Sequence, residues 1–331
     1  MRLPAAQSVL CGIAASCVAL AGLGVNESSA LSQSTKLQGS WSNKAPLPAK
    51  RGEVSVAALD GKIYAVGGAG LGNSASQLNQ EYDPATNSWR DRARLPRGMS
   101  HAGVVGLNHK LYVVGGFTAS GVHAGAVNLV FAYDLATDSW QQLAPLSSPR
   151  GSVGVAEVGG KIHAIGGRGL DKVTVATHEV YDPTNGKWSQ AAPLPTARDH
   201  MGVIAVDGKI HVIGGRTADN TDNTNLHDVY DPSTNSWQSA APLLAGRSAG
   251  AAAYYHGLIL YAGGECKGGK TFSENEAYDP TANRWQTLAP LPAGRHGFGA
   301  AAVGEYIYFA GGALGCGGGS LSDELLVFRL P

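Results

Sequence analysis

Five arginines recur along the chain, each sixteen residues before a pair of adjacent glycines. Methionine takes the sixth place, and the column reads Arg51, Met99, Arg150, Arg198, Arg247 and Arg295. A guanidinium is always charged, and its planar fork of donors matches a carboxylate. Like charges gathered at one place repel unless an anion lies between them. We therefore expect the five arginines to bind an acidic ligand.

A second column lies two positions further on and contains most of the other ionisable candidates. It reads Glu53, His101, Ser152, His200, Ala249 and Gly297, and His296 stands beside the last arginine. We predict a ligand site made of the five arginines with His101, His200 and His296. In an enzyme, Glu53 and His200 could transfer protons. A structural role for each arginine stays open, because its stem can pack on apolar neighbours while its head bonds loop carbonyls.

Glycine pairs and single tryptophans set the period of the chain. The glycine pairs begin at Gly67, Gly115, Gly166, Gly214, Gly263 and Gly311. The tryptophans are Trp41, Trp89, Trp140, Trp188, Trp237 and Trp285. Successive differences in both series are 48, 51, 48, 49 and 48. A period near fifty with this signature indicates a β-propeller.

Each repeat reads as four antiparallel strands, a to d, as the fourth repeat illustrates. Residues 201–206 and 209–213 flank Asp207-Gly208, a strong signal for a tight hairpin. Residues 228–230 and 236–238 flank a turn containing Pro232 and Asn235, which favour tight turns. The last repeat has strand c at residues 325–328 but no strand d, whereas Trp41 opens the chain as a strand d without its own a, b and c. We expect the strand around Trp41 to join the C-terminal blade and close the ring, which removes exposed edges.

The glycine pair, the Tyr-Asp-Pro turn and the spaced tryptophan together resemble the kelch repeat, over about residues 40–331. The resemblance implies an all-β, six-bladed β-propeller of four-stranded blades with strand a lining the channel. From tyrosine to tryptophan the spacing is always seven residues, so length varies only between strands b and c. Because the strands alternate in direction, the b–c loops share a face with the start of strand a. Variable loops and the channel mouth are therefore expected on one face, where ligands bind.

The first thirty residues predict export. Arg2 precedes an apolar run, and Ser28, Ser29 and Ala30 are small residues of the kind that precede a cleavage site. We assign residues 1–30 to a signal peptide, 31–39 to a short linker and 40–331 to one propeller domain. The protein is then periplasmic or extracellular, with no membrane insertion after cleavage. In that compartment Cys266 and Cys316, in equivalent loops of adjacent blades, could form a disulfide or stay unpaired in glycine-rich loops.

Several other sites are disfavoured. The chain carries no net charge, which argues against nucleic acid as a partner. The glycines after residue 67 open no helical pattern, and the polar stretch 219–225 lacks the glycine and terminal glutamate of a calcium loop. The histidines show no spacing typical of a metal site, and we predict no cofactor and no metal. The tryptophans are interpreted as blade packing.

Two functions are compatible with these observations. The first is an exported binding protein whose arginine-lined mouth and b–c loops take a protein or an anionic, carboxylate-bearing small molecule or glycan. The alternative, implied by the resemblance, is a carbohydrate-active enzyme of the sialic acid mutarotase type, with Glu53 and His200 as its acid and base. Copper oxidases on kelch propellers need seven blades and added domains, which this chain does not have room for. Fold alone does not decide between the two.

Overall fold

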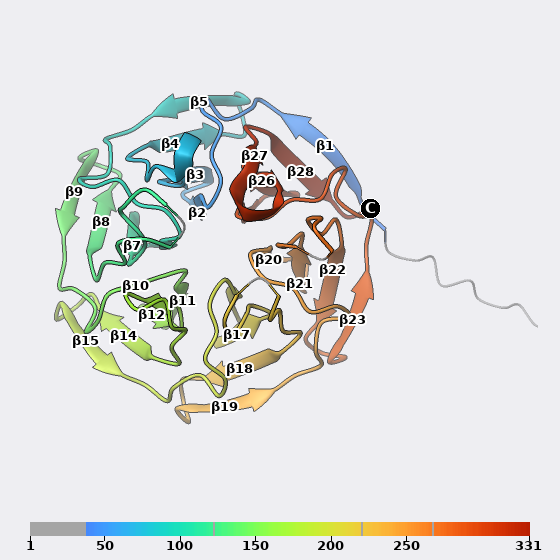
Figure 1. Cartoon of the computed structure of the whole chain (residues 1–331). Helices are drawn as coiled ribbons and strands as arrows, with labels where there is room; N and C mark the ends of the chain where they lie inside the picture. Colours follow the sequence, from blue (N-terminus) through green and yellow to red (C-terminus); the bar gives the residue numbers. More distant parts are fainter. Residues whose placement is uncertain (1–37, 122, 220, 267) are drawn as a thin grey trace, which may run out of the picture. The chain divides into compact units, whose positions relative to one another are not determined.

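A computed structural model of the chain describes residues 38–331, except residues 122, 220 and 267. The predicted signal peptide and most of the predicted linker lie outside the described residues. Within them the chain forms a β-propeller of six four-stranded antiparallel sheets arranged around a central axis (Figure 1). The predicted fold class is confirmed. The described helices are short, and none is long and apolar enough to cross a membrane.

Blades 1 to 5 take their four strands in chain order from the axis outward, and blade 6 takes its outermost strand from the start of the described chain. Blade 1 contains β2 (Ser55–Leu59), β3 (Lys62–Val66), β4 (Asn79–Asp83) and β5 (Ser88–Asp91). Blade 2 contains β6 (Gly103–Leu107), β7 (Lys110–Val114), β8 (Val130–Asp134) and β9 (Ser139–Gln142). Blade 3 contains β11 (Gly154–Val158), β12 (Lys161–Ile165), β14 (His178–Asp182) and β15 (Lys187–Gln190).

The other three blades follow the same plan. Blade 4 contains β16 (Gly202–Val206), β17 (Lys209–Ile213), β18 (His227–Asp231) and β19 (Ser236–Ser239). Blade 5 contains β20 (Ala251–Tyr255), β21 (Leu258–Ala262), β22 (Asn275–Asp279) and β23 (Arg284–Thr287). Blade 6 contains β24 (Gly299–Val303), β25 (Tyr306–Ala310), β28 (Leu325–Arg329) and β1 (Ser40–Lys44). In blade 6, β1 pairs antiparallel with β28, which sets Trp41 opposite Phe328.

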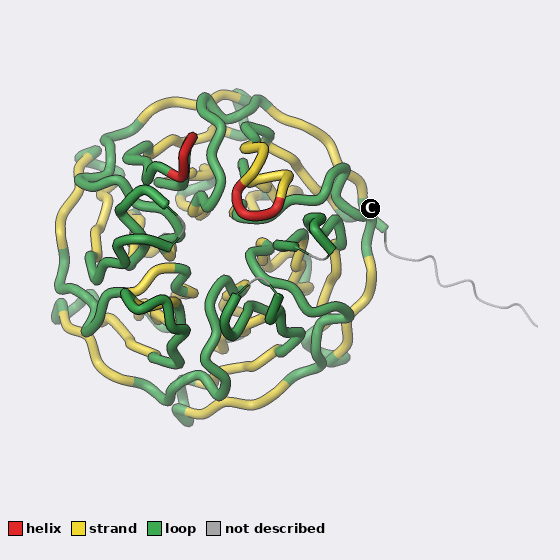
Figure 2. The backbone as a smooth tube through the Cα atoms, viewed as in Figure 1, coloured by secondary structure: helices red, strands yellow, loops and turns green. Residues whose placement is uncertain are grey.

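Short elements lie on one face of the ring, in the b–c loops and in one d–a connection, where the loops extend toward the centre (Figure 2). They are the β10–β13 pair (Arg150–Gly151 and Arg168–Gly169), the β26–β27 pair (Ala313–Gly315 and Gly319–Leu321) and the one-turn helices η1 (Leu71–Asn73) and η2 (Cys316–Gly318). We call this side the loop face. The d–a connections reach it too, because their residues bridge to b–c loop residues, as Ser248 does to Glu265.

Repeated residues join each blade to the next. The indole Nε1 of every tryptophan donates to an alanine carbonyl of the preceding d–a connection, at 2.7–3.0 Å. The second glycine of each pair donates its N–H to the carbonyl of residue 51, 99, 150, 198, 247 or 295 in the adjoining blade, at 2.8–3.0 Å. At the first glycine of each pair, with φ near +65°, a Cβ would approach that same carbonyl to 2.4–2.7 Å. Only glycine therefore fits where two blades meet.

Candidate functional site

The five arginines lie inside the blades and do not line the mouth. Arg51, Arg150, Arg198, Arg247 and Arg295 are each at most 1% exposed. Four of the guanidiniums donate to the carbonyl of the first paired glycine in their own blade, at 2.8–3.3 Å, and that of Arg150 donates to the Ala164 carbonyl at 3.2 Å. The prediction that these arginines line the channel mouth is therefore wrong. Each arginine has a structural role inside its blade.

Each arginine also has a polar partner at or near strand c. The partners are Gln80 for Arg51, Glu179 for Arg150, Asp228 for Arg198, Glu276 for Arg247 and Glu324 for Arg295. In blade 2, where Met99 replaces arginine, Phe131 occupies the corresponding position of strand c, and both side chains join one apolar cluster. Four of the five charges are thus paired with a carboxylate of the same blade, and Arg51 bonds to the neutral amide of Gln80. An acidic ligand finds its predicted partners already occupied.

The second column does reach the mouth. Its residues, Glu53, His101, Ser152, His200, Ala249 and Gly297, all adopt left-handed backbone conformations, with φ between 49° and 60°. Backbone hydrogen bonds link most of them around the axis: the N–H of one residue donates to the carbonyl of the preceding one in four places, at 2.8–3.2 Å. We call these six residues the neck ring. The repeated left-handed turn directs whichever side chain a blade carries toward the channel.

Glu53 lies between two histidines. Its Oε2 is 3.3 Å from Nε2 of His101, and its Oε1 is 3.4 Å from Nδ1 of His296. Burial by itself would raise the pKa of Glu53, but the electrostatic interaction with His101 and the hydrogen bond from His296 outweigh it and hold the pKa well below its usual range. Burial would lower the pKa of His296, yet the bond to Glu53 raises it. Glu53 and His296 thus form a buried acid–imidazole pair.

On the other side of the mouth His200 is held by Asp199. The Nδ1–H of His200 donates to Oδ1 of Asp199, which is fully buried. Asp199 also accepts from Arg216 Nε at 2.9 Å and from Arg168 Nη1 at 3.1 Å. Burial would raise the pKa of Asp199, but the neighbouring His200 and Arg216 lower it further than burial raises it. Asp199 is therefore an anion that fixes the orientation of the His200 ring.

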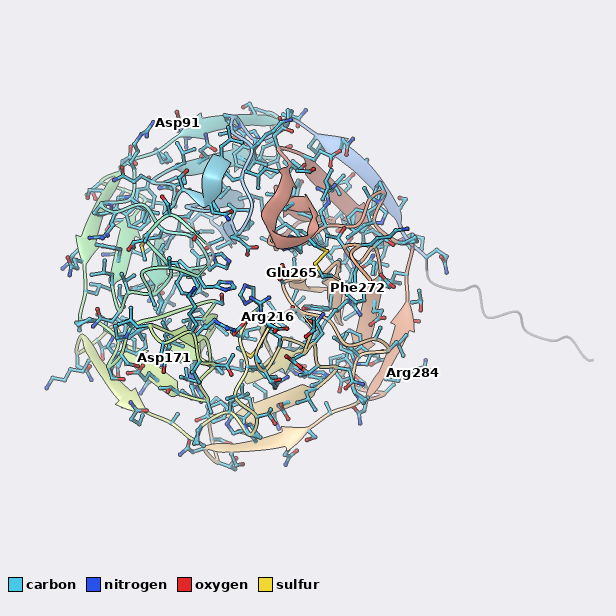
Figure 3. All side chains as sticks on the ribbon, in the orientation of Figure 1. Asp91, Asp171, Arg216, Glu265, Phe272 and Arg284 are labelled. Atoms are coloured by element: carbon cyan, nitrogen blue, oxygen red, sulfur yellow. A yellow bond between two sulfur atoms is a disulfide. The ribbon has the colours of Figure 1, made fainter. Side chains whose placement is uncertain are left out.

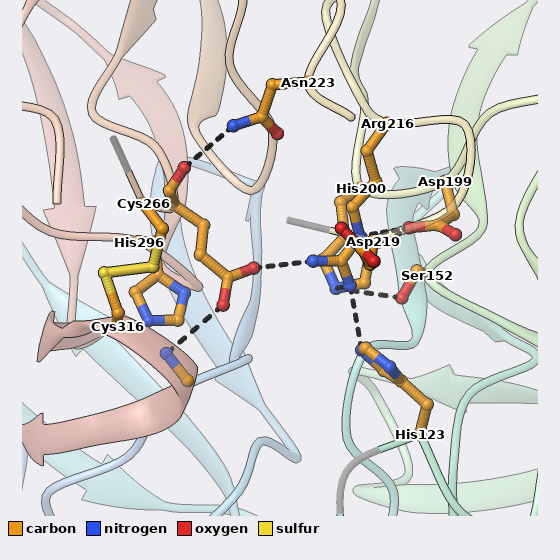
Figure 4. Close-up of polar contacts among 12 residues, drawn as sticks. His123, Ser152, Asp199, His200, Arg216, Asp219, Asn223, Cys266, His296 and Cys316 are labelled. Carbon is orange, nitrogen blue, oxygen red and sulfur yellow. Dashed lines mark hydrogen bonds and ion pairs between the residues drawn. A yellow bond between two sulfur atoms is a disulfide. The ribbon is translucent and has the colours of Figure 1, made fainter. Parts of the chain in front are cut away.

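Arg216 connects the two sides of the mouth (Figure 4). Its Nη1 donates to Glu265 at 2.8 Å, and its Nη2 donates to Nε2 of His123 at 3.1 Å and to Nε2 of His200 at 3.2 Å. Glu265 also accepts the N–H of Gly317 at 3.3 Å. Cys266 and Cys316, the neighbours of these two residues in the sequence, form a disulfide with Cα atoms 5.5 Å apart. The disulfide thus ties together the two loops that hold Glu265.

The histidines come together in a way that their spacing did not indicate. One ring nitrogen from each of His101, His123 and His200 lies within 4.8 Å of the others. Burial lowers the pKa of His101 to about 4 and that of His123 to about 2, so both rings are neutral near pH 7. His123, Asp199, Arg216 and Glu265 had not been predicted as site residues. His123, Arg216 and Glu265 come from b–c loops, whose conformations no hydrophobic pattern sets.

Ser152, His200 and Asp199 lie in the order of a hydrolytic triad, with Ser152 Oγ 3.3 Å from His200 Nε2. Two contacts argue against that chemistry. The lone pair of Nε2 already accepts from Arg216, and the N–H of Ser152, which would serve an oxyanion, donates to the His101 carbonyl at 2.8 Å.

The space at the neck is small. A cavity of about 140 Å³ is lined by the neck ring and the first residues of the inner strands, and a second, of about 40 Å³, lies among Glu53, His101, His123 and His296. Sites for drug-sized ligands usually occupy about 300–1,000 Å³. Below the neck the channel widens to about 440 Å³ and is lined by small apolar residues of the inner strands. The neck therefore suits an ion or a few solvent molecules better than a sugar.

Comparisons with known proteins agree with this architecture. Residues 63–320 match the family model described as the Attractin/LZTR1 beta-propeller. Comparison with curated proteins found no significant match. The solved structure titled "Structure of YjhT" superposes with a TM-score of 0.74 at 18% sequence identity, covering 87% of this chain and 100% of that one. At that identity the likeness shows the fold alone.

Proposed function

Because this chain belongs to the Attractin/LZTR1 beta-propeller family, we propose that it is an exported protein-interaction propeller that docks an apolar segment of a partner on its loop face. One observation carries the proposal. Among the described residues, all the exposed large hydrophobic side chains lie on the loop face: Leu71, Leu170, Val173, Leu244 and Leu314, which are 39–90% exposed. Exposed apolar side chains gathered on one face are typical of interaction surfaces.

A groove on the same face offers a place for an anchoring side chain. It has a volume of about 860 Å³ and lies among loops of blades 4, 5 and 6, with Leu244, Phe272 and the Cys266–Cys316 disulfide in its lining. Phe272 is itself buried, so it forms the floor of the groove, whereas Leu244 is 59% exposed at its rim. The disulfide also supports export, because such bonds persist in oxidising compartments.

The test uses random linear peptides displayed on phage as the probe. We expect selection against the wild-type protein to enrich peptides rich in aliphatic and aromatic residues. The triple variant Leu71→Ser, Leu170→Ser, Leu244→Ser should bind those peptides with a dissociation constant at least tenfold higher, about 1.4 kcal/mol, in biolayer interferometry. The matched control carries Ala85→Ser, Ala136→Ser and Ala282→Ser, three exposed positions in c–d turns on the opposite face. Failure to enrich any sequence, or equal binding by both triple variants, would contradict the proposal.

The second candidate function is that of an enzyme of the sialic acid mutarotase type, and one observation supports it. Glu53 and His200 line the same small cavity, as an acid and a base for proton transfer would. The arginine clamp that this chemistry needs is absent from the predicted positions, because those guanidiniums are buried in the blades. NMR measurement of anomer exchange in N-acetylneuraminic acid decides the matter: acceleration that Glu53→Gln abolishes would favour this enzyme over the binding protein.

A further inference from the structure

Three imidazoles from two non-adjacent blades meet at the neck. His101 and His200 belong to the neck ring in blades 2 and 4, and His123 comes from the loop between β7 and β8. Their ring centroids form a nearly equilateral triangle with sides of 5.2, 5.1 and 5.1 Å. Imidazole nitrogen is the donor that zinc, copper, nickel and iron favour, and three histidines leave one coordination position of a tetrahedral ion open.

Two of the lone pairs converge on a single point, and a cationic group occupies that point. The Nδ1–H of His200 is directed at Asp199, so Nε2 carries the free lone pair. Arg216 Nη2 donates both to this atom, at 3.2 Å, and to Nε2 of His123, at 3.1 Å. Arg216 Nη2 therefore takes the place, between two unprotonated ring nitrogens, that a metal ion would take.

The surroundings also match those of a metal site. A ligating histidine usually donates its other N–H to a carboxylate, which fixes the tautomer and strengthens the ligand. Asp199 makes this contact with His200, and two arginines hold Asp199 in place. In His101, Ser100 Oγ lies 3.1 Å from Nδ1 and accepts its N–H when Nε2 binds the ion, and Glu53 Oε2 lies 3.3 Å from that Nε2.

We propose that His101, His123 and His200 bind one divalent transition-metal ion of the Zn²⁺ type, with solvent at the fourth position beside Glu53. Zn–N bonds of about 2.05 Å at tetrahedral angles place the nitrogens about 3.3 Å apart, so the triangle must contract. His123 lies on a loop and makes that adjustment. The ion displaces Arg216 Nη2, and because the guanidinium is planar and moves as a unit, its bonds to Asp199 through Nε and to Glu265 through Nη1 must rearrange with it. This inference goes beyond the proposed docking function, because the neck lies on the channel axis below the loop face.

The experiment titrates the chelator-stripped protein with Zn²⁺ by calorimetry and with Co²⁺ by visible absorption. We expect one Zn²⁺ per chain and the ligand-field bands of tetrahedral Co²⁺. His123 lies on a loop, so His123→Ala is the ligand substitution least harmful to folding. It should lower the affinity for Zn²⁺ at least about 100-fold. Arg216→Gln should tighten binding about tenfold, because a competing positive charge is removed.

Two controls separate this site from nonspecific binding. His109→Ala and His256→Ala each remove an exposed histidine from an a–b hairpin on the opposite face, and both variants should bind Zn²⁺ like the wild type. Near-UV circular dichroism checks the fold of every variant. The proposal is overturned if Co²⁺ shows no tetrahedral bands, if a folded His123→Ala variant binds as tightly as the wild type, or if Arg216→Gln loses the ion.

Discussion

The arginine column and the neck ring lie two residues apart in every blade, yet they do opposite things. An arginine occupies five of six positions in the column, and each one is buried with partners supplied by its own blade. The ring carries a different residue in nearly every blade, and its side chains meet across blades. In a repeat protein, then, a position that recurs maintains the scaffold, whereas a position with a recurring backbone and a changing side chain forms the site. The predictions below test that distinction.

Removal of a recurring element should have the largest effect. Trp41 supplies the recurring tryptophan of blade 6, packing on Phe309 and Phe328 at centroid distances of 5.1 and 4.8 Å. A chain that starts after Lys50 lacks β1 and leaves this cluster open. We expect it to lose its cooperative thermal transition in circular dichroism, whereas a chain starting at Leu31 keeps it. Equal melting of the two would show that β1 does not close the ring.

A single substitution in the arginine column should come next. Arg247 donates to Glu276 at 3.1 Å and to the Gly263 and Tyr261 carbonyls at 3.0 Å. Arg247→Met leaves the Glu276 carboxylate buried without its partner, and we expect the free energy of unfolding in urea to fall by about 3–5 kcal/mol. Adding Glu276→Phe reproduces the Met99–Phe131 pair of blade 2 and should recover much of the loss. No recovery would mean that the arginine does more than maintain the blade.

The buried histidine pairs form a third class of position. Their residue types differ between blades, as in the neck ring, but their side chains are buried inside the blades, as in the arginine column. His211 Nδ1 lies 2.8 Å from His227 Nε2 in blade 4, where blade 1 has Tyr64 and Asn79. Burial lowers the pKa of His211 to about 4 and that of His227 to about 3. The unfolded chain takes up protons near pH 6.5 and the folded one does not, so stability present at pH 7 is lost as the pH falls toward 4.

Between pH 7 and pH 5 this loss amounts to roughly 2 kcal/mol for each histidine. Urea unfolding of the wild type should show it. The variant His211→Tyr with His227→Asn carries the blade 1 residues and should show a shallower dependence on pH. Ser189→Asn, at an exposed position of β15 without an ionisable group, serves as the control and should leave the dependence as it is. Parallel curves for the wild type and the double variant would contradict the assignment.

The smallest effect is expected in the neck ring itself. Ala249 has φ +54°, where a Cβ strains the native backbone, and glycine relieves that strain. Glycine also raises the conformational entropy of the unfolded chain, which lowers stability. The two effects nearly cancel, and we expect Ala249→Gly to change the free energy of unfolding by less than about 0.5 kcal/mol. The matched change Ala262→Gly, in a buried strand, should cost more. A large loss at Ala249 would make the ring part of the scaffold.

The sequence predicted the scaffold well because its signals are local. Tight turns, glycine pairs and the alternation of strands each depend on a few neighbouring residues, such as Asp207-Gly208 or Pro232. The arginines were wrongly predicted to line the channel mouth, because their recurrence in five of the six repeats was interpreted as evidence of a ligand site. Their partners Glu179, Asp228 and Glu276 stand two residues before the strand-c tyrosine, and this spacing could have revealed the internal pairs.

The site was predicted only in part. Glu53, His101, His200 and His296 do meet at the mouth, although the five arginines expected with them do not. The contact between His101 and His200 depends on the curvature of the ring across three blades. His123, Arg216 and Glu265 depend on irregular loops, whose paths are set by tertiary contacts and not by local preference. Figure 3 shows Arg216 and Glu265 near the axis and Asp91 and Arg284 at the rim.

The pairing of β1 with β28 also has a consequence for the order of events during biosynthesis. Trp41 leaves the ribosome well before its partner Phe328, which lies 287 residues further along the chain (328 − 41). The apolar cluster that joins blade 1 to blade 6, which contains Ile63, Tyr82 and Tyr308, cannot assemble before then. Contacts this distant in sequence make folding slow. Until Phe328 has been synthesised, the strand around Trp41 has no partner strand, and the nascent chain carries five complete blades beside an incomplete sixth.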